Sequence, residues 1–354
     1  MRLSKKKNIS KIWKTQKQPI HLGLGSNPSE KSSRPSDADI SHLRLLYKGN
    51  KFQDTILFSR GLEKKYGEID LLYFYRGLSF KALGSLRQAL DCFSKAIQLN
   101  PQNFLAHNHK GEVLEILGEL INAAQSFRNA IGIDRNFSDG HHNLGLCLKR
   151  MGNIKESIDS YSKAIEINPK NFMTHNNLGN ALYSIGRVEE SIESFKQAIN
   201  LNPEFSEVYF NIGNAFRLLK MSKLAIDHYR TALKKKPDFA EAYNYLGTLL
   251  GELGHTDSAL AQLEKAVEAK PGYAIAHNNA GKILFESRNN QDALREYNRA
   301  LLAKPDYTEA FCNRAVLHFR IGDYKNSIRD YLDAVKVDPK CIEAYYGLGN
   351  VWNA

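Results

Sequence analysis

Apolar residues in this chain recur at the three- and four-residue spacing that places them on one face of an α-helix. One such run contains Leu144, Leu148 and Met151, and a second run a few residues later contains Ile158 and Ile165. Similar paired runs follow one another along most of the sequence. The pattern predicts an all-α chain built from helical hairpins.

Prolines mark a period of 34 residues between residues 101 and 339. They occupy all but one of the evenly spaced positions, and Arg135 takes the remaining one. We number each unit so that this position is 32, which leaves a ninth, incomplete unit starting at Ile342. The complete units are 70–103, 104–137, 138–171, 172–205, 206–239, 240–273, 274–307 and 308–341. A repeat of this length indicates an array of stacked units.

Small and bulky residues recur at fixed positions of the unit. Position 8 is glycine except at Ala315, position 27 is always alanine, and position 24 carries a large side chain. We expect the small residues to admit the bulky group of the paired helix.

The turn and the helix starts are also marked in the sequence. Position 15 is glycine except at Lys220 and Arg288, and it marks the turn between the two helices. Asp238 and Glu241 have the spacing of a capping box and predict a helix start after the proline.

These features resemble the tetratricopeptide repeat (TPR), a helix-turn-helix unit of 34 residues. The resemblance covers residues 70–354, with eight full repeats in 70–341 and the first helix of a ninth in 342–354. It implies a right-handed α-solenoid of such repeats. The stretch "HNNLGNAL", followed by "ESI" and "LNP", is most similar to the TPR arm of protein O-linked N-acetylglucosamine transferases. Bacterial TPR proteins fused to glycosyltransferase or sulfotransferase domains are also similar.

The two ends of the array depart from the repeat. Residues 36–69 are interpreted as a degenerate TPR-like hairpin that caps the stack, because its outer face meets water. In the ninth unit we expect Tyr345, Leu348 and Trp352 to lack a second helix to cover them. A second copy of the chain, giving a homo-oligomer, or a further domain of a longer protein would cover such an apolar face.

The net charge of +11 is concentrated in the first 35 residues, which carry +8 and leave +3 for the rest. Because this segment is rich in Lys, Ser, Asn and Pro, we expect residues 1–35 to form a basic disordered tail. Nucleic-acid binding by the repeats is therefore disfavoured.

No apolar run approaches the roughly 20 residues of a membrane span, and no secretory signal is present, which predicts a cytoplasmic protein.

The first helices of stacked hairpins form a concave surface suited to an extended peptide. Position 6 is asparagine in five units: Asn143, Asn177, Asn211, Asn279 and Asn313. Carboxamides donate and accept hydrogen bonds, so this series can hold a peptide backbone regardless of its sequence. Asparagine is also a poor helix former, which favours binding over the alternative that these groups merely solvate an open face. The resemblance to the transferases implies the same role.

Further polar residues extend this candidate site. Asn180 and Asn214 stand at position 9, and Lys149 and Arg217 stand at position 12. The two cations could pair with acidic groups of a ligand. Position 5 lacks the lysine with which another variety of TPR binds the C-terminal carboxylate of chaperones, so that role is disfavoured.

Nothing in the sequence indicates catalysis, a cofactor or a metal. It contains no phosphate-binding glycine loop, GxSxG or HExxH motif, and its four cysteines form no CxxC pair. Histidines at position 4 exchange with aromatic residues, which indicates packing, and successive hairpins hold them too far apart to share one ion. These histidines are His107, His141, His175 and His277.

The sequence therefore predicts a scaffold that binds a partner protein or an extended peptide in its concave groove and has no enzymatic activity in these 354 residues. The alternative is the substrate-recognition arm of a larger glycosyltransferase or sulfotransferase whose catalytic domain lies outside this chain.

Overall fold

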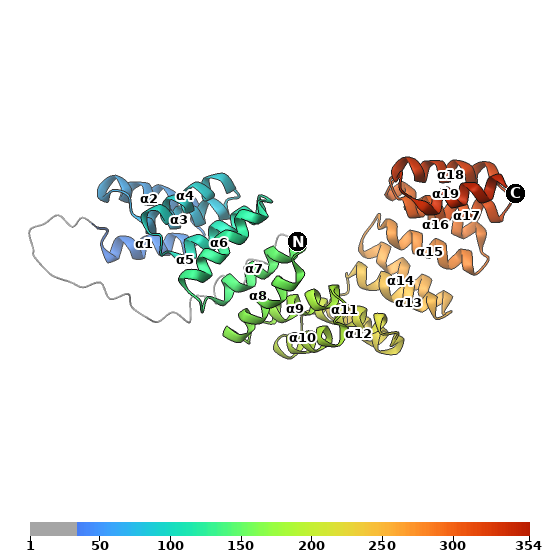
Figure 1. Cartoon of the computed structure of the whole chain (residues 1–354), viewed down its shortest axis with the longest axis horizontal. Coiled ribbons are helices and arrows are strands. Elements are labelled where there is room, and N and C mark those ends of the chain that lie inside the picture. The colour runs from blue at the N-terminus through green and yellow to red at the C-terminus, as the bar shows by residue number, and fades with distance from the viewer. Residues whose placement is uncertain (1–33) are drawn as a thin grey trace, which may run out of the picture. The chain divides into compact units, whose positions relative to one another are not determined.

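The computed structural model describes residues 34–354 and divides the chain into two compact units, which are treated separately. The first ends at Leu99, and the second comprises Asn100–Ala354. The described residues form 19 α-helices and contain no β-strand (Figure 1). The all-α fold expected from the sequence is confirmed. Apart from Arg34 and Pro35, the expected basic tail lies outside the described residues.

The first unit consists of two helical hairpins. Its helices are α1 (Asp37–Lys48), α2 (Phe52–Tyr66), α3 (Asp70–Ala82) and α4 (Leu86–Leu99). Residues 36–69 form the hairpin α1–α2, in which a capping box between Ser36 and Asp39 starts the first helix. Although its sequence diverges, this hairpin keeps the 34-residue numbering, because Ser59 at position 24 and Leu62 at position 27 are buried as in the later repeats.

The second unit continues the same pattern through α19. Its first helices are α5 (Phe104–Ile116), α7 (Ser138–Arg150), α9 (Phe172–Ser184), α11 (Ser206–Leu218), α13 (Ala240–Glu252), α15 (Ala274–Glu286), α17 (Thr308–Arg320) and α19 (Ile342–Trp352). Its second helices are α6 (Leu120–Ile133), α8 (Ile154–Ile167), α10 (Val188–Leu201), α12 (Ser222–Lys235), α14 (Thr256–Ala269), α16 (Asn290–Ala303) and α18 (Tyr324–Val337). Among residues 34–354, no helix has the length and apolar content that a bilayer crossing requires.

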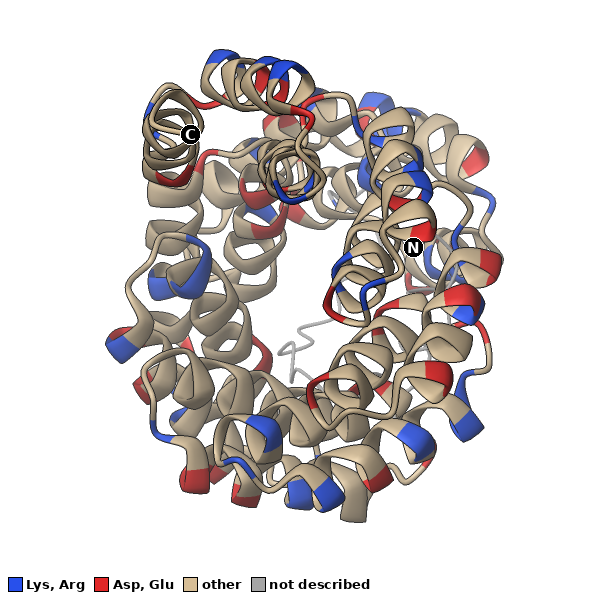
Figure 2. Ribbon diagram, turned by 90° about the vertical axis from the view of Figure 1, so that its right-hand side faces the viewer, with Lys and Arg blue, Asp and Glu red and all other residues tan. Residues whose placement is uncertain are grey.

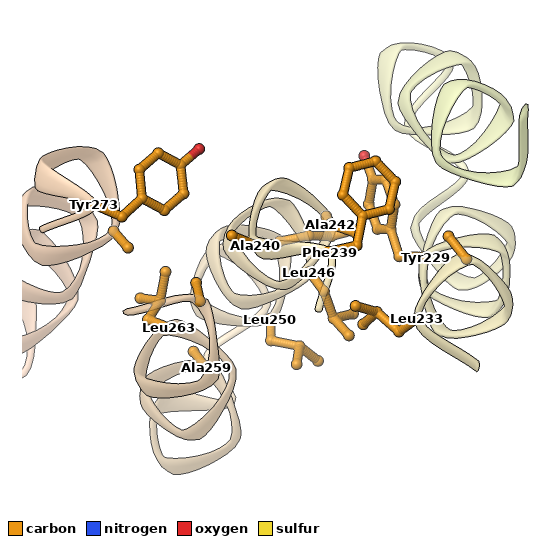
Figure 3. Close-up of a cluster of buried hydrophobic side chains, with 14 of the residues drawn as sticks. Tyr229, Leu233, Phe239, Ala240, Ala242, Leu246, Leu250, Ala259, Leu263 and Tyr273 are labelled. Atoms are coloured by element: carbon orange, nitrogen blue, oxygen red, sulfur yellow. The ribbon is translucent and has the colours of Figure 1, made fainter. Parts of the chain in front are cut away.

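In the complete repeats that have glycine at position 8, the two helices of the hairpin interlock through positions 8 and 24. In the repeat 206–239, a Cβ added to Gly213 would lie 2.5 Å from the ring of Tyr229, so only glycine leaves room for that ring. Figure 3 shows Tyr229 beside Phe239, and Leu233 of the same second helix pointing toward Leu246 of the next repeat. The expected small-to-large packing within the hairpin is confirmed, and the contact of Leu233 with Leu246 joins this hairpin to the next.

The repeat 308–341 packs differently because Ala315 replaces the glycine. Its position-24 ring, Tyr331, lies against Gly347 of α19, where an added Cβ would come within 2.2 Å of the ring. Glycine at position 6 of the ninth unit therefore admits the ring of the preceding repeat.

Position 15 takes a left-handed backbone at each hairpin turn, whether or not the residue is glycine. Lys220 and Arg288, the two exceptions in the sequence, have φ of 58° and 61°, and Asn50 of the first hairpin has 58°. Residues other than glycine are strained in this conformation. The geometry of the turn thus imposes a positive φ on these three residues, although each would by itself prefer a negative φ.

The expected capping box at Asp238 and Glu241 does not form. Helix α13 begins at Ala240, so its N-cap is Phe239 at position 34, and no side chain caps the helix. The ring of Phe239 is buried and lies 5.0 Å from that of Phe210. Packing of the aromatic side chain therefore takes the place of a polar cap.

The exposed face expected on the ninth unit is only partly present. Tyr345 and Trp352 are exposed, but Leu348 is 4% exposed and packs with Tyr331 and Ala334 of the preceding hairpin. The expectation for Leu348 was wrong, because the position-24 ring reaches across to α19. Self-association through this helix stays a prediction.

Replacing Gly179 with alanine should destabilise the protein, because the new Cβ would lie 2.6 Å from the buried ring of Phe195. We expect the free energy of unfolding to fall by about 1 to 3 kcal/mol in urea denaturation. Gly349→Ala is the matched control: no atom lies within 4 Å of its added Cβ, and alanine favours a helix. Equal losses in both variants would contradict the steric role of position 8.

Lys220→Gly should stabilise the protein by about 0.5 to 1 kcal/mol. Glycine removes a left-handed strain of about 1 to 2 kcal/mol, and its greater freedom in the unfolded chain offsets part of that gain. Gly254→Ala, at the same position of the next repeat, should have the opposite sign. If urea denaturation showed a loss of stability for Lys220→Gly, a contact of the lysine side chain would outweigh the strain.

Candidate functional site

Within the second unit, neighbouring first helices contact one another, for example α7 with α9 and α17 with α19. Neighbouring second helices of residues 100–354, such as α6 and α8, make no comparable contacts. The first helices thus form the more closely spaced row, which is the inner side of a stack of hairpins. We call the surface made by positions 2, 6, 9, 12 and 13 of these helices the inner face.

The asparagines at position 6 lie between neighbouring first helices, and four of the five are paired. Each donates from its amide nitrogen to an asparagine oxygen at position 5 of the preceding repeat. The pairs are Asn143 with Asn108 (3.0 Å), Asn211 with Asn176 (2.9 Å), Asn279 with Asn244 (2.9 Å) and Asn313 with Asn278 (3.0 Å). We call them the amide pairs.

The amide pairs stabilise the stack and orient the groups that remain for a ligand. Asn143 and Asn279 use the same nitrogen for a second contact, to Glu112 and Thr248 at 3.3 Å, and keep only the amide oxygen. Asn211 donates once and retains one N–H as well as its oxygen. All five position-6 side chains are half-buried. The pairs were not predicted from the sequence, although asparagine at position 5 of one repeat and at position 6 of the next is their signal.

Asn177 is the unpaired member of the series. Position 5 of the repeat before it is His142, whose Nδ1 lies 2.8 Å from the hydroxyl of Thr174. Burial lowers the pKa of His142 to about 4, so the ring is neutral at pH 7. Within residues 34–354, the Asn177 amide makes no hydrogen bond to another side chain or to the backbone, so both of its polar atoms remain for a ligand.

The two asparagines at position 9 have different environments. Asn214 accepts a hydrogen bond of 2.7 Å from the hydroxyl of Tyr229, so it supports the position-24 ring of its own hairpin. In the repeat 172–205, position 24 is Phe195, which has no hydroxyl to donate, and Asn180 has no hydrogen-bond partner among the described residues. In the repeat 138–171, Leu146 takes position 9, and the buried hydroxyl of Tyr161 finds no partner.

The two cations at position 12 also differ. Arg217 forms an ion pair of 2.5 Å with Glu252 of the next repeat, and its guanidinium lies over the ring of Tyr245. Lys149 is half-buried, burial lowers the pKa of its ammonium, and no carboxylate of the described residues pairs with it. Its neighbour Arg150 is paired with Glu115 at 2.9 Å. Lys149 is therefore the predicted cation that stays available to a ligand.

Charges of both signs are interspersed over the helices (Figure 2). Two ion pairs form across the hairpin in the same way: Lys236 lies 3.8 Å from Glu207, and Lys270 lies 3.3 Å from Glu241. Each pair joins position 31 of a repeat to its own position 2.

Three of the four histidines at position 4 bond to the backbone of the preceding turn, whereas His277 bonds to the carboxylate of Glu296 at 2.7 Å. His107 donates to the carbonyl of Pro101 at 3.2 Å, and His175 donates to that of Pro169 at 2.9 Å. Tyr209 donates to Pro203 in the same way, which explains why histidine and tyrosine exchange at this position. In the described part of the chain, no three His, Cys, Asp or Glu side chains converge as metal ligands would.

Comparison with known proteins gives the family. Models described as "TPR repeat" or "Tetratricopeptide repeat" match residues 71–103, 105–137, 148–186, 179–219, 206–239, 228–261, 246–310 and 308–341. These segments together account for well over half of the chain.

Individual relatives are distant. The chain is 32% identical to the Hordeum vulgare protein named "Probable UDP-N-acetylglucosamine--peptide N-acetylglucosaminyltransferase SPINDLY" over an aligned segment of 85 residues. That segment covers 23% of this chain and 9% of the Hordeum protein. A tetratricopeptide repeat protein from Parabacteroides merdae is 17% identical with a TM-score of 0.59, covering 71% of this chain and all of that one. Yeast Tom70 is 15% identical with a TM-score of 0.51, covering 89% and 87%. The Parabacteroides protein and Tom70 share the helical repeat fold of this chain.

The matches to residues 71–103, 105–137, 206–239 and 308–341 follow the same 34-residue frame that places the glycine-ring interlock and the amide pairs. Members of this family generally serve as scaffolds for protein interactions. The chain belongs to the tetratricopeptide repeat family.

Proposed function

We propose that this protein binds an extended, acidic peptide segment along its inner face, with the centre of the site on α7 and α9. One observation carries the proposal: the polar groups left without partners gather where the amide pairs are interrupted. Lys149 belongs to α7, and Asn177 and Asn180 belong to α9. A cytoplasmic location for this role stays a prediction.

Repeat geometry supports the proximity of these groups. Asn279 follows Thr248 by 31 residues, and their side chains approach to 3.3 Å across neighbouring first helices. Asn180 follows Lys149 by the same number of residues, one turn further along such a helix pair. Because neighbouring first helices run parallel, the offset that joins one turn also joins the next. Lys149 and Asn180 therefore face the same part of the inner face.

The chemistry of this region suits a peptide that brings both a backbone and a carboxylate. The amide of Asn177 can donate to a peptide carbonyl and accept from a peptide N–H. Lys149 offers an ammonium that burial has partly desolvated, so a carboxylate paired with it is less screened than one at an exposed site. The amide pairs on either side hold the remaining oxygens in fixed directions, which lowers the ordering cost of binding.

A second candidate function rests on the similarity to the SPINDLY protein. In that role the repeats would present a substrate segment to a glycosyltransferase or sulfotransferase domain outside these 354 residues. The reading frame beyond Ala354 tests it: a catalytic domain there would support the role, and an immediate stop codon would remove its main support.

Asn177→Ala should weaken peptide binding without loss of stability, because the native amide has no partner to lose. A fluorescent peptide selected on the full chain from a random library would serve as the probe, and its anisotropy would report affinity. We expect the dissociation constant to rise about 2- to 10-fold, the value of one or two neutral hydrogen bonds.

Asn211→Ala is the matched variant, since it also breaks the amide pair with Asn176. It should lower the free energy of unfolding by about 1 kcal/mol, whereas Asn177→Ala should not lower it, because alanine is the better helix former. Unaltered affinity in the Asn177 variant would remove this residue from the proposed site.

Lys149→Gln should lower the affinity for an acidic library peptide by about 10-fold or more, because the ammonium pairs with a carboxylate. The same peptide with Gln and Asn in place of Glu and Asp should bind the native protein and the variant alike. Arg150→Gln is the control, since Arg150 is already paired with Glu115. Equal losses at residues 149 and 150 would indicate general charge attraction and contradict a specific contact.

A further inference from the structure

Two cysteine side chains meet in the repeat 308–341. Cys312 lies in α17 and is fully buried, and Cys341 is the half-buried N-cap residue of α19. Their sulfur atoms are 3.8 Å apart. No other pair of cysteines in residues 34–354 makes such a contact, since Cys147 donates instead to the carbonyl of Leu120.

The repeat architecture produces this contact. Cys312 occupies position 5 and Cys341 position 34 of the same repeat, and these two positions also meet elsewhere. Phe210 and Phe239 have ring centroids 5.0 Å apart, and Asn278 donates to the hydroxyl of Tyr307 at 3.4 Å. A hairpin that carries cysteine at both positions therefore brings two thiols together without any special loop.

The two thiols differ in their readiness to react. Burial, together with the neighbouring Cys341 thiol, raises the pKa of Cys312, so it stays protonated at neutral pH. Cys341 begins α19 at the edge of the cluster that contains Cys312 and Tyr331, and part of it is open to solvent. An oxidant in solution thus reaches Cys341 first, and the buried Cys312 thiol lies next to it.

We propose that Cys312 and Cys341 form an oxidisable dithiol site that a hydroperoxide converts into an intramolecular disulfide between α17 and the start of α19. With hydrogen peroxide, the Cys341 thiol attacks one peroxide oxygen, the O–O bond breaks, and a sulfenic acid and one water form. The Cys312 sulfur then attacks the sulfenic sulfur and expels a second water. Two thiols are oxidised by two electrons in total, and one peroxide is reduced to two waters.

Little movement is needed for this bond. The sulfurs must approach from 3.8 Å to about 2.05 Å. Cys341 lies at the junction of loop and helix, where its N–H donates to the carbonyl of Asp338 and its own carbonyl accepts from the N–H of Tyr345. The disulfide would close the chain between residues 312 and 341 and tie the N-terminus of α19 to α17. A dithiol reductant would reverse it by thiol–disulfide exchange.

The experiment treats the reduced full-length chain with hydrogen peroxide and maps its disulfides by mass spectrometry. The expected result is one linked peptide pair containing Cys312 and Cys341, with loss of two hydrogens and no disulfide between chains, which returns to the thiol form with dithiothreitol. Hydrogen exchange of the α19 amides should slow several-fold in the oxidised form and recover on reduction.

Two variants complete the test. Cys341→Ser should abolish the linked pair and the change in exchange while its circular dichroism stays native, because the residue is half-buried. Cys147→Ser, a cysteine outside the pair, should leave both intact. The proposal is overturned if peroxide yields sulfinic acid at Cys341 with Cys312 unmodified, or if Cys341 links only to a second chain.

Discussion

The structure depends on one steric interaction, the insertion of the position-24 side chain into the space left by glycine at position 8. At Gly145, for example, an added Cβ would come within 2.7 Å of the ring of Tyr161, which is fully buried. This contact fixes both the distance and the rotation between the two helices of a hairpin. Because it recurs in successive repeats, each hairpin presents its remaining side chains in the same register.

A constant register makes contacts between repeats recur at constant sequence separations. Residues 35 apart join neighbouring first helices in the amide pair of Asn211 with Asn176, in the ion pair of Arg217 with Glu252 and in that of Arg150 with Glu115. These polar contacts bridge helices whose apolar faces are already committed to the hairpin cores. The asparagines of the inner face therefore have a structural role in addition to the proposed binding role, and the two roles divide the polar atoms of each amide.

The proposed functional groups lie in repeats whose residues differ from those usual at the same repeat position. His142 bonds to Thr174 and so leaves Asn177 without a partner. Leu146 stands where the repeat 206–239 has Asn214, and the hydroxyl of Tyr161 has no hydrogen-bond partner among the described residues. Cysteines at positions 5 and 34 of the repeat 308–341 replace an aromatic or amide contact by two thiols. In each case the fold is kept, because the buried position-24 ring of the repeat still packs, on Gly145 and Gly179 of their own hairpins and, for Tyr331, on Gly347 of α19.

The sequence by itself determined the repeat length, the all-α hairpins and the partners at positions 8 and 24, because these follow from the spacing of residue types along one chain. It also indicated the inner-face residues, since position 6 is marked by repeated asparagine. It did not show which of them are occupied: Arg217 and Lys149 look alike in sequence, yet only Arg217 finds a carboxylate, Glu252, in the next repeat. Likewise, the burial of Leu348 by Tyr331 and the left-handed backbone of Lys220 follow from neighbouring side chains and turn geometry. Such contacts join residues of different helices, and only the packed structure decides them.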